Sequence, residues 1–101
     1  MAVKPEILKL ALNRMNITWE PDEKELENVT AAIEEAVAFL RARSGNKELD
    51  LTGPEYRGLL IEGAWYFKNQ MRAEFEEDYR AEIISLRLVE GFGCGKEESE
   101  V

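Results

Sequence analysis

Hydrophobic positions recur at helical spacing in the first half of this chain. One stripe runs through about residues 5–15, and a longer one runs from about Pro21 or Asp22 to Arg43. The stripes consist of Ile7, Leu8, Ala11, Leu12 and Met15, and of Leu26, Val29, Ile33, Ala36, Val37 and Leu40. A period of about 3.6 residues is typical of amphipathic helices that bury one face. Both stretches are therefore predicted to be helices.

Two further stripes occupy the second half of the chain. Their members are Tyr56, Leu59, Leu60, Gly63, Ala64 and Phe67, and then Phe75, Tyr79, Ile83 and Leu86. Thr52 and Glu55 match a capping box, in which the Thr side chain accepts from the backbone and the Glu side chain reaches back. We therefore expect a third helix that begins here and ends near Asn69, and a fourth over about residues 73–89. Residues 70–73 are either a tight turn or a continuous bend.

Length and composition favour one all-α domain, a single-domain antiparallel bundle of about four helices. The 101 residues suffice for one domain and are too few for two. With 45% hydrophobic and 34% charged residues, the chain can bury a modest core. We expect residues 1–92 to form the domain and residues 93–101 to be a flexible acidic tail. No segment has the length of a membrane span, and the N-terminus lacks signal-peptide architecture.

The net charge and the residue types present limit the functions that this chain can have. The net charge of −8 argues against a protein that grips nucleic-acid phosphates, because such proteins usually carry a basic face. There is no histidine, the commonest general acid/base and metal ligand, and the single cysteine, Cys94, has no partner for an intramolecular disulfide. We therefore predict no catalytic residue, no metal site and no cofactor.

Paired glutamates leave one enzymatic alternative, a Mg²⁺-dependent all-α nucleotide pyrophosphohydrolase. Glu20 with Glu23, and Glu74 with Glu77, have the i, i+3 spacing that puts two carboxylates on one helix face. Such enzymes typically add an E-x-x-D pair, and here no glutamate stands three residues before an aspartate. A solvated acidic face is the preferred interpretation. A generic bacterial helical adaptor is the other alternative.

The aromatic triplet at positions 65–67 could be a nucleic-acid stacking platform, but three consecutive helix positions point in three directions, which favours two other interpretations. Phe67 continues the third stripe, while Trp65 and Tyr66 flank it. The two flanking side chains are either the rim of a wide core face or part of a subunit interface, where Trp and Tyr are enriched. Gly63 lies within the same stripe, where glycine costs about 1 kcal/mol relative to alanine. A close approach between helices is the expected reason.

The hydrophobic pattern of the second half resembles the small all-helical head–tail connector proteins of long-tailed phages and their prophages. The pattern consists of an aromatic-rich third helix that ends in Phe67-Lys68-Asn69, followed by Ala73-Glu74-Phe75, Tyr79, Glu82-Ile83-Ile84, Leu86 and Leu88. The resemblance extends from the first predicted helix to Phe92 and is strongest over residues 59–88. Hydrophobic patterns are less specific than a metal-ligand or phosphate-binding signature.

This resemblance implies a structural adaptor without enzymatic activity. Members of the family form a ring beneath the portal protein after DNA packaging. The ring bridges the portal to a stopper or tail-completion protein, and DNA passes through it without specific binding. For this chain the family implies self-association, assembly in the bacterial cytoplasm and a final place in the virion neck of a phage or prophage.

The family also suggests contact surfaces. The end of its fourth helix and its tail contact the portal or a neighbouring subunit, and the loop between its second and third helices faces the channel or the next adaptor. The docking candidates here are Leu88, Val89 and Phe92. The candidates for an acidic surface along the DNA are Glu34, Glu35, Lys47, Glu48 and Asp50. Because like charges repel, such a surface would let DNA pass without sticking.

Overall fold

The computed structural model describes residues 4–17 and 20–91, and these residues form helices, turns and loops without any strand. The elements in chain order are α1 (Pro5–Arg14), α2 (Glu23–Ser44), α3 (Arg57–Lys68), α4 (Arg72–Asp78), α5 (Arg80–Leu86) and a π-helical turn, η1 (Arg87–Gly91). The all-α prediction is confirmed. No helix in the described ranges combines the length and the apolar character that crossing a membrane requires.

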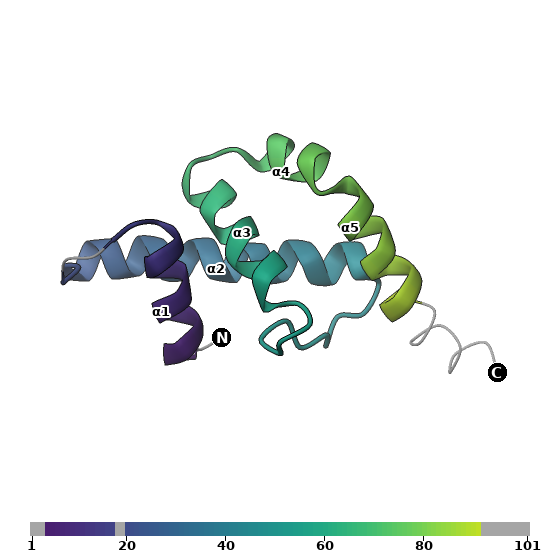
Figure 1. The fold of residues 1–101 in the computed structure, drawn as a ribbon, viewed down its shortest axis with the longest axis horizontal. Coiled ribbons are helices and arrows are strands. Elements are labelled where there is room, and N and C mark those ends of the chain that lie inside the picture. Colours follow the sequence, from purple (N-terminus) through teal and green to yellow (C-terminus); the bar gives the residue numbers. More distant parts are fainter. Residues whose placement is uncertain (1–3, 18–19, 92–101) are drawn as a thin grey trace.

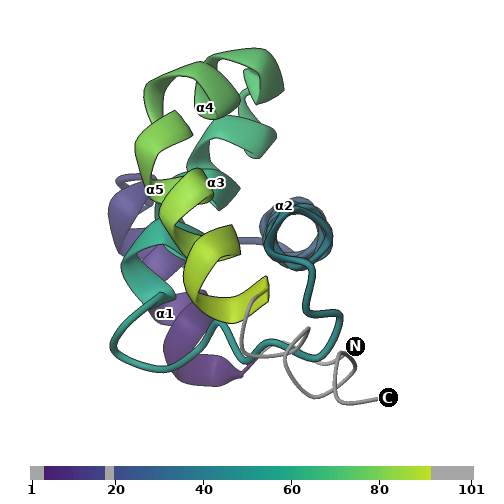
Figure 2. The same cartoon turned by 90° about the vertical axis from the view of Figure 1, so that its right-hand side faces the viewer.

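The long helix α2 organises the molecule. Figure 1 shows α1 and α3 crossing it, α4 above it, and α5 descending toward its C-terminal end. Its most extensive packing is against α3, and it also contacts α1, α5 and η1. Figure 2 looks along α2 and shows the other helices gathered on one side of it. The opposite side of α2 is therefore left to solvent.

The core confirms the four predicted stripes. It contains Ile7, Ala11, Val29, Ile33, Ala36, Val37, Leu40, Leu60, Gly63, Ala64, Phe67, Phe75 and Leu86, with Tyr79 and Ile83 packed against it. Phe75 is fully buried, and its ring centroid lies 5.8 Å from that of Phe39 and 5.7 Å from that of Phe67. The buried face of α2 is wider than its stripe, because Ala32 and Phe39 are also buried.

The structure places α2 between two local end signals. At its N-terminus, the Asp22 carboxylate accepts a hydrogen bond from the Glu25 amide at 2.7 Å. At its C-terminus, Gly45 adopts a left-handed backbone with φ 81°. A side-chain N-cap and a left-handed glycine are the common solutions for unpaired amides and carbonyls at helix ends.

Helices α1 and α3 end in left-handed residues that are not glycine. Asn16 has φ 61° and Gln70 has φ 58°. The residue after each bonds back across the turn, the Ile17 amide to the Leu12 carbonyl at 2.9 Å and the Met71 amide to the Tyr66 carbonyl at 2.8 Å. This is the Schellman arrangement, which satisfies carbonyls at a helix end. At Gln70 this arrangement shows that residues 70–73 begin with a tight turn and not a continuous bend.

The predicted capping box at Thr52 and Glu55 is wrong. The Thr52 hydroxyl donates to the Asp50 carboxylate at 2.6 Å, and α3 begins at Arg57 without a side-chain cap. The chain before it turns, with the Arg57 amide bonded to the Gly53 carbonyl at 2.9 Å. An aspartate two residues away offers the hydroxyl a charged acceptor, and hydrogen bonds to charged groups are stronger than neutral ones.

The predicted continuous fourth helix is also wrong. Tyr79, with φ −112° and ψ 25°, separates α4 from α5, and the chain ends in η1 rather than in a regular α-helix. The Tyr79 ring packs at 5.2 Å from Phe75 and at 5.8 Å from Tyr66. The Tyr79 hydroxyl points to Glu62 at 3.4 Å. Contacts with α3 therefore accompany the interruption.

The loop after α2 contributes two residues to the core. Leu49 and Leu51 are buried, while Asp50 between them is exposed. Side chains two residues apart in an extended segment point the same way. The Arg41 guanidinium donates to the Leu49 carbonyl at 2.8 Å and holds this segment against α2.

Candidate interaction surface

Large apolar side chains are exposed at the end of the described chain. Ile84, Leu88 and Val89 are 53%, 51% and 59% exposed, and we name these three residues the C-terminal ridge. On the other side of the same segment, Leu86 is buried. The structure therefore leaves Leu88 and Val89 open to solvent and adds Ile84 to them. Phe92, the third docking candidate, lies outside the described residues.

The C-terminal ridge stands on an anchored segment. The Tyr56 hydroxyl at the start of α3 donates to the Glu90 carboxylate in η1 at 2.6 Å. This bond favours the neutral phenol and, together with burial, raises the pKa of Tyr56 to about 12. A small hollow of about 220 Å³ lies beside the ridge and is lined by Tyr56, Leu59 and Val89, among others.

A second surface runs between α2 and the turn from α3 to α4. It consists of two hollows of about 570 and 400 Å³ that share Glu35 and Arg72, and we name them together the α2 groove. Its lining residues are Asn28, Ala31, Ala32, Glu35, Phe67, Lys68, Gln70 and Arg72 in the first hollow, and Ala38, Phe39, Ala42 and Arg43 in addition in the second. The Arg72 guanidinium lies over the rings of Phe39 and Phe67, at 5.1 and 5.6 Å from their centroids.

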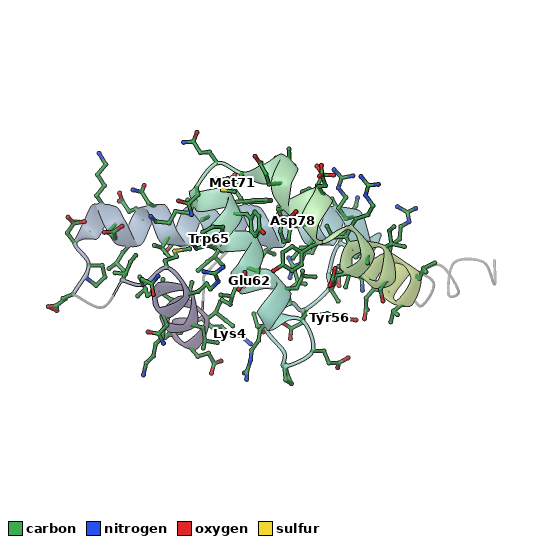
Figure 3. The ribbon with its side chains drawn as sticks, turned by 45° about the horizontal axis from the view of Figure 1, so that its top comes forward. Lys4, Tyr56, Glu62, Trp65, Met71 and Asp78 are labelled. Carbon is green, nitrogen blue, oxygen red and sulfur yellow. The ribbon has the colours of Figure 1, made fainter. Side chains whose placement is uncertain are left out.

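The two aromatic candidates, Trp65 and Tyr66, contact other parts of the same chain. The Arg14 guanidinium lies 4.7 Å from the centroid of the Trp65 ring and donates to the Glu62 carboxylate at 2.6 and 3.0 Å. Figure 3 shows Trp65 and Glu62 on α3, and Asp78 at the end of α4 beside them. Arg14 therefore joins α1 to α3 at this cluster. Both rings are half-buried, and their role in a subunit interface stays a prediction.

Tyr66 joins α3 to α4. Its hydroxyl donates to the Asp78 carboxylate at 2.9 Å, and its ring packs against Trp65, Phe75 and Tyr79. The bond to Asp78 raises the pKa of Tyr66 to about 12. Burial and the nearby Glu62 raise the pKa of Tyr79 as well. All three tyrosines therefore remain neutral at physiological pH.

The structure does not bring the acidic-surface candidates into one cluster. Glu35 belongs to the α2 groove, and Glu34 lies beside it on α2. Lys47, Glu48 and Asp50 are exposed on the loop, beyond the end of α2. Helix rise puts Glu35 roughly 14 Å before Ser44 along the axis. Hydrogen bonds from the Thr52 hydroxyl and amide lower the pKa of Asp50, so this carboxylate stays ionised.

The carboxylate pairs weighed for a metal site are far from one another. Glu23 is the first residue of α2 and Glu20 lies in the connector before it, while Glu74 and Glu77 lie in α4, which Figure 1 shows above the middle of α2. All four are exposed. Within residues 4–17 and 20–91, no group of three or more Asp, Glu, His or Cys residues is placed to hold a metal ion.

Comparison with protein-family models, with curated proteins and with solved structures finds no match to this chain. A function is therefore inferred from the C-terminal ridge and the α2 groove. Sequence reasoning missed Ile84 and the α2 groove, although signals for both exist. Ile84 stands one helical turn before Leu88, and the alanines at 31, 38 and 42 share one face of α2.

Proposed function

We propose that this chain is a structural adaptor of a phage neck. It joins a ring beneath the portal after DNA packaging and links the capsid to a stopper or tail-completion protein. DNA passes through the ring. The observation that carries the proposal is the C-terminal ridge, which lies where the connector resemblance puts the contact with the portal or a neighbouring subunit.

The exposure of the C-terminal ridge supports a docking role. Clustered exposed apolar residues mark interaction sites more often than single ones do. The hydrogen bond between Tyr56 and Glu90 holds η1 in place before any partner arrives, which lowers the entropy lost on binding. We also propose that α4, α5 and η1 together form the fourth segment of an antiparallel bundle, as in the connector family.

Assembled particles provide the direct test. In a phage or prophage that carries this gene, we expect deletion to give DNA-filled heads without tails, and the wild-type gene to restore tailed particles. Leu88→Asp should fail to restore them, because a charged side chain cannot be buried in an apolar contact. Leu10→Ser is the matched control: Leu10 is 38% exposed on α1, away from the C-terminal ridge, and its loss should leave tailing intact.

The proposal fails if purified virions and tailed intermediates lack the protein and its deletion leaves normal tailed particles. That outcome would favour a generic helical adaptor, which could carry the same ridge. Neighbouring genes separate the two functions, since portal, capsid and tail genes alongside are expected only for a neck protein.

A truncation tests the terminal segment separately. Deleting residues 91–101 should leave helix content and melting nearly unchanged while abolishing incorporation beneath the portal. Circular dichroism and pull-down with the portal protein of the same genome measure the two effects. If the truncated protein unfolds, the segment belongs to the core, and if it still incorporates, the docking role assigned to Phe92 is wrong.

A further inference from the structure

We propose that the C-terminal ridge of one copy docks into the α2 groove of the next, so that the subunits meet head to tail. This inference rests on the proposed ring and names the two surfaces that would form its subunit contact. It is drawn from the complementary size and charge of the ridge and the groove.

The sizes match. The α2 side of the groove exposes alanine at positions 31, 38 and 42, so its surface is low where a solvated helix usually carries long charged side chains. The C-terminal ridge protrudes instead, because it carries the bulky side chains of Ile84 and Leu88 one helical turn apart, with Val89 beside them. From Asn28 to Arg43 the groove spans roughly 22 Å of helix, and residues 80–89 span roughly 14 Å at 1.5 Å per residue. The ridge therefore fits within the groove.

The charges match as well. The groove has Glu35 on its α2 wall and Arg72 on its opposite wall. By helical periodicity, Arg80 and Arg87 lie on one flank of the ridge and Glu82 lies on the other. One docking direction therefore pairs Glu35 with an arginine and Arg72 with Glu82, and the reversed direction juxtaposes like charges.

The other cations of the groove have acidic partners within their own chain. Arg43 pairs with Glu76 at 2.8 Å, and Lys68 lies 3.9 Å from Glu25. These pairs reduce the repulsion that Arg43 and Lys68 would exert on the arginines of the ridge. Glu35 and Arg72 are thus the charges that select the docking direction.

A single chain does not join its own two surfaces. Helix α5 and η1 pack against α2 through the buried Leu86 side, which points the C-terminal ridge away from their own bundle. A contact between two different surfaces of identical chains is heterologous and closes into a ring when the rotation allows it. Three ridge side chains make a contact well below the roughly 1,000 Å² of a stable interface. Isolated copies should therefore associate weakly, while closure on a template strengthens the assembly.

Directed disulfides test this contact in the full chain. With Cys94 replaced by Ser, the double variant Ala38→Cys with Ser85→Cys places one thiol in the groove and one beside the ridge. Oxidised at about millimolar concentration, where weak contacts are populated, it should give a ladder of multimers on denaturing gels. Each single-cysteine variant can give dimers at most. The matched control, Ala38→Cys with Leu10→Cys, should give no ladder, because Leu10 is exposed on α1.

Charge exchange adds the second arm. Glu35→Arg or Arg87→Glu in the double-cysteine protein should reduce ladder formation by at least about tenfold, because like charges then meet. Combining both reversals should restore the ladder.

Absence of a ladder from the Ala38–Ser85 pair, or failure of the combined reversal to restore it, overturns the docking contact. If the protein is found beneath the portal but shows no ladder, the contact fails while the adaptor function stands. If a ladder forms but particles lack the protein, the adaptor function fails while the contact stands.

Discussion

Gly63 sets how closely α3 approaches its neighbours. A Cβ at this position would lie 3.0 Å from Cζ of Phe75 and 3.5 Å from Cβ of Ala36. Phe75 is fully buried and has no room to move aside. We expect Gly63→Ala to lower the free energy of unfolding by about 1–2 kcal/mol, because overpacking outweighs the helix-propensity gain of about 1 kcal/mol. Urea denaturation measures it.

Gly58 provides the matched control in the same helix. A Cβ there would meet nothing within 4 Å. Gly58→Ala should therefore raise the free energy of unfolding by up to about 1 kcal/mol through backbone entropy and helix propensity. If both alanine variants were more stable than the wild type, Gly63 would not be needed for the close approach.

Gln70 occupies a backbone conformation that suits glycine. With φ 58°, it sits in the left-handed region at the end of α3, where a side chain costs roughly 1–2 kcal/mol. Gln70→Gly removes this cost and adds unfolded-state entropy, so a net gain of about 1 kcal/mol in unfolding free energy is expected. Gln70→Ala keeps the Cβ and should gain nothing. An equal gain from both variants in a denaturant titration would contradict the explanation.

At the scale of secondary-structure elements, one hydrogen bond ties η1 to the start of α3. Tyr56→Phe deletes the donor to Glu90 and should cost about 1 kcal/mol locally. We expect faster amide hydrogen exchange in residues 87–90 and little change in α1 or α2. Tyr79→Phe is the control, because its 3.4 Å contact with Glu62 does not involve η1. Unchanged exchange in residues 87–90 would show that other contacts hold η1.

The same bond makes the attachment sensitive to high pH. Folding raises the pKa of Tyr56 from 10.0 to about 12, so the folded state favours the neutral phenol. Its contribution to stability is therefore complete below pH 10 and is lost as the pH rises from 10 to 12. Absorbance titration at high pH should show a late tyrosinate component, because the pKa of Tyr66 is also about 12, and Tyr56→Phe should reduce this component by one tyrosine. Normal titration of all three tyrosines would rule out the pKa shift.

At the scale of the whole molecule, the net charge of −8 governs encounters with DNA. The described acidic residues are concentrated at the start of α2 and in α4. We expect no detectable binding to duplex DNA at about 100 μM protein and physiological salt, because repulsion replaces the counterion-release gain of basic proteins. Fluorescence polarisation with a labelled duplex measures it. Tight binding that weakens with salt would contradict the proposal that a repulsive surface of this protein lines a path for DNA.

The sequence by itself determined the helical class, the four apolar stripes, the ends of α2 and the net charge. Each of these depends on residues within one or two turns of each other or on composition alone. Asp22 and Gly45 act on their neighbours, and the spacing of Val29, Ile33 and Leu40 needs no other helix to be recognised. For the candidate surfaces, the sequence indicated Leu88 and Val89 but not which side chains surround them.

Only the tertiary structure decided the interruption at Tyr79, the burial of Leu49 and Leu51, and the α2 groove. Each depends on partners that are distant in the sequence. Tyr79 contacts the aromatic side of α3, and the groove exists because α3 and α4 rise beside α2 on one side only. A local pattern shows that a residue is apolar or small. Whether it is buried, exposed or part of a groove depends on which elements pack against it.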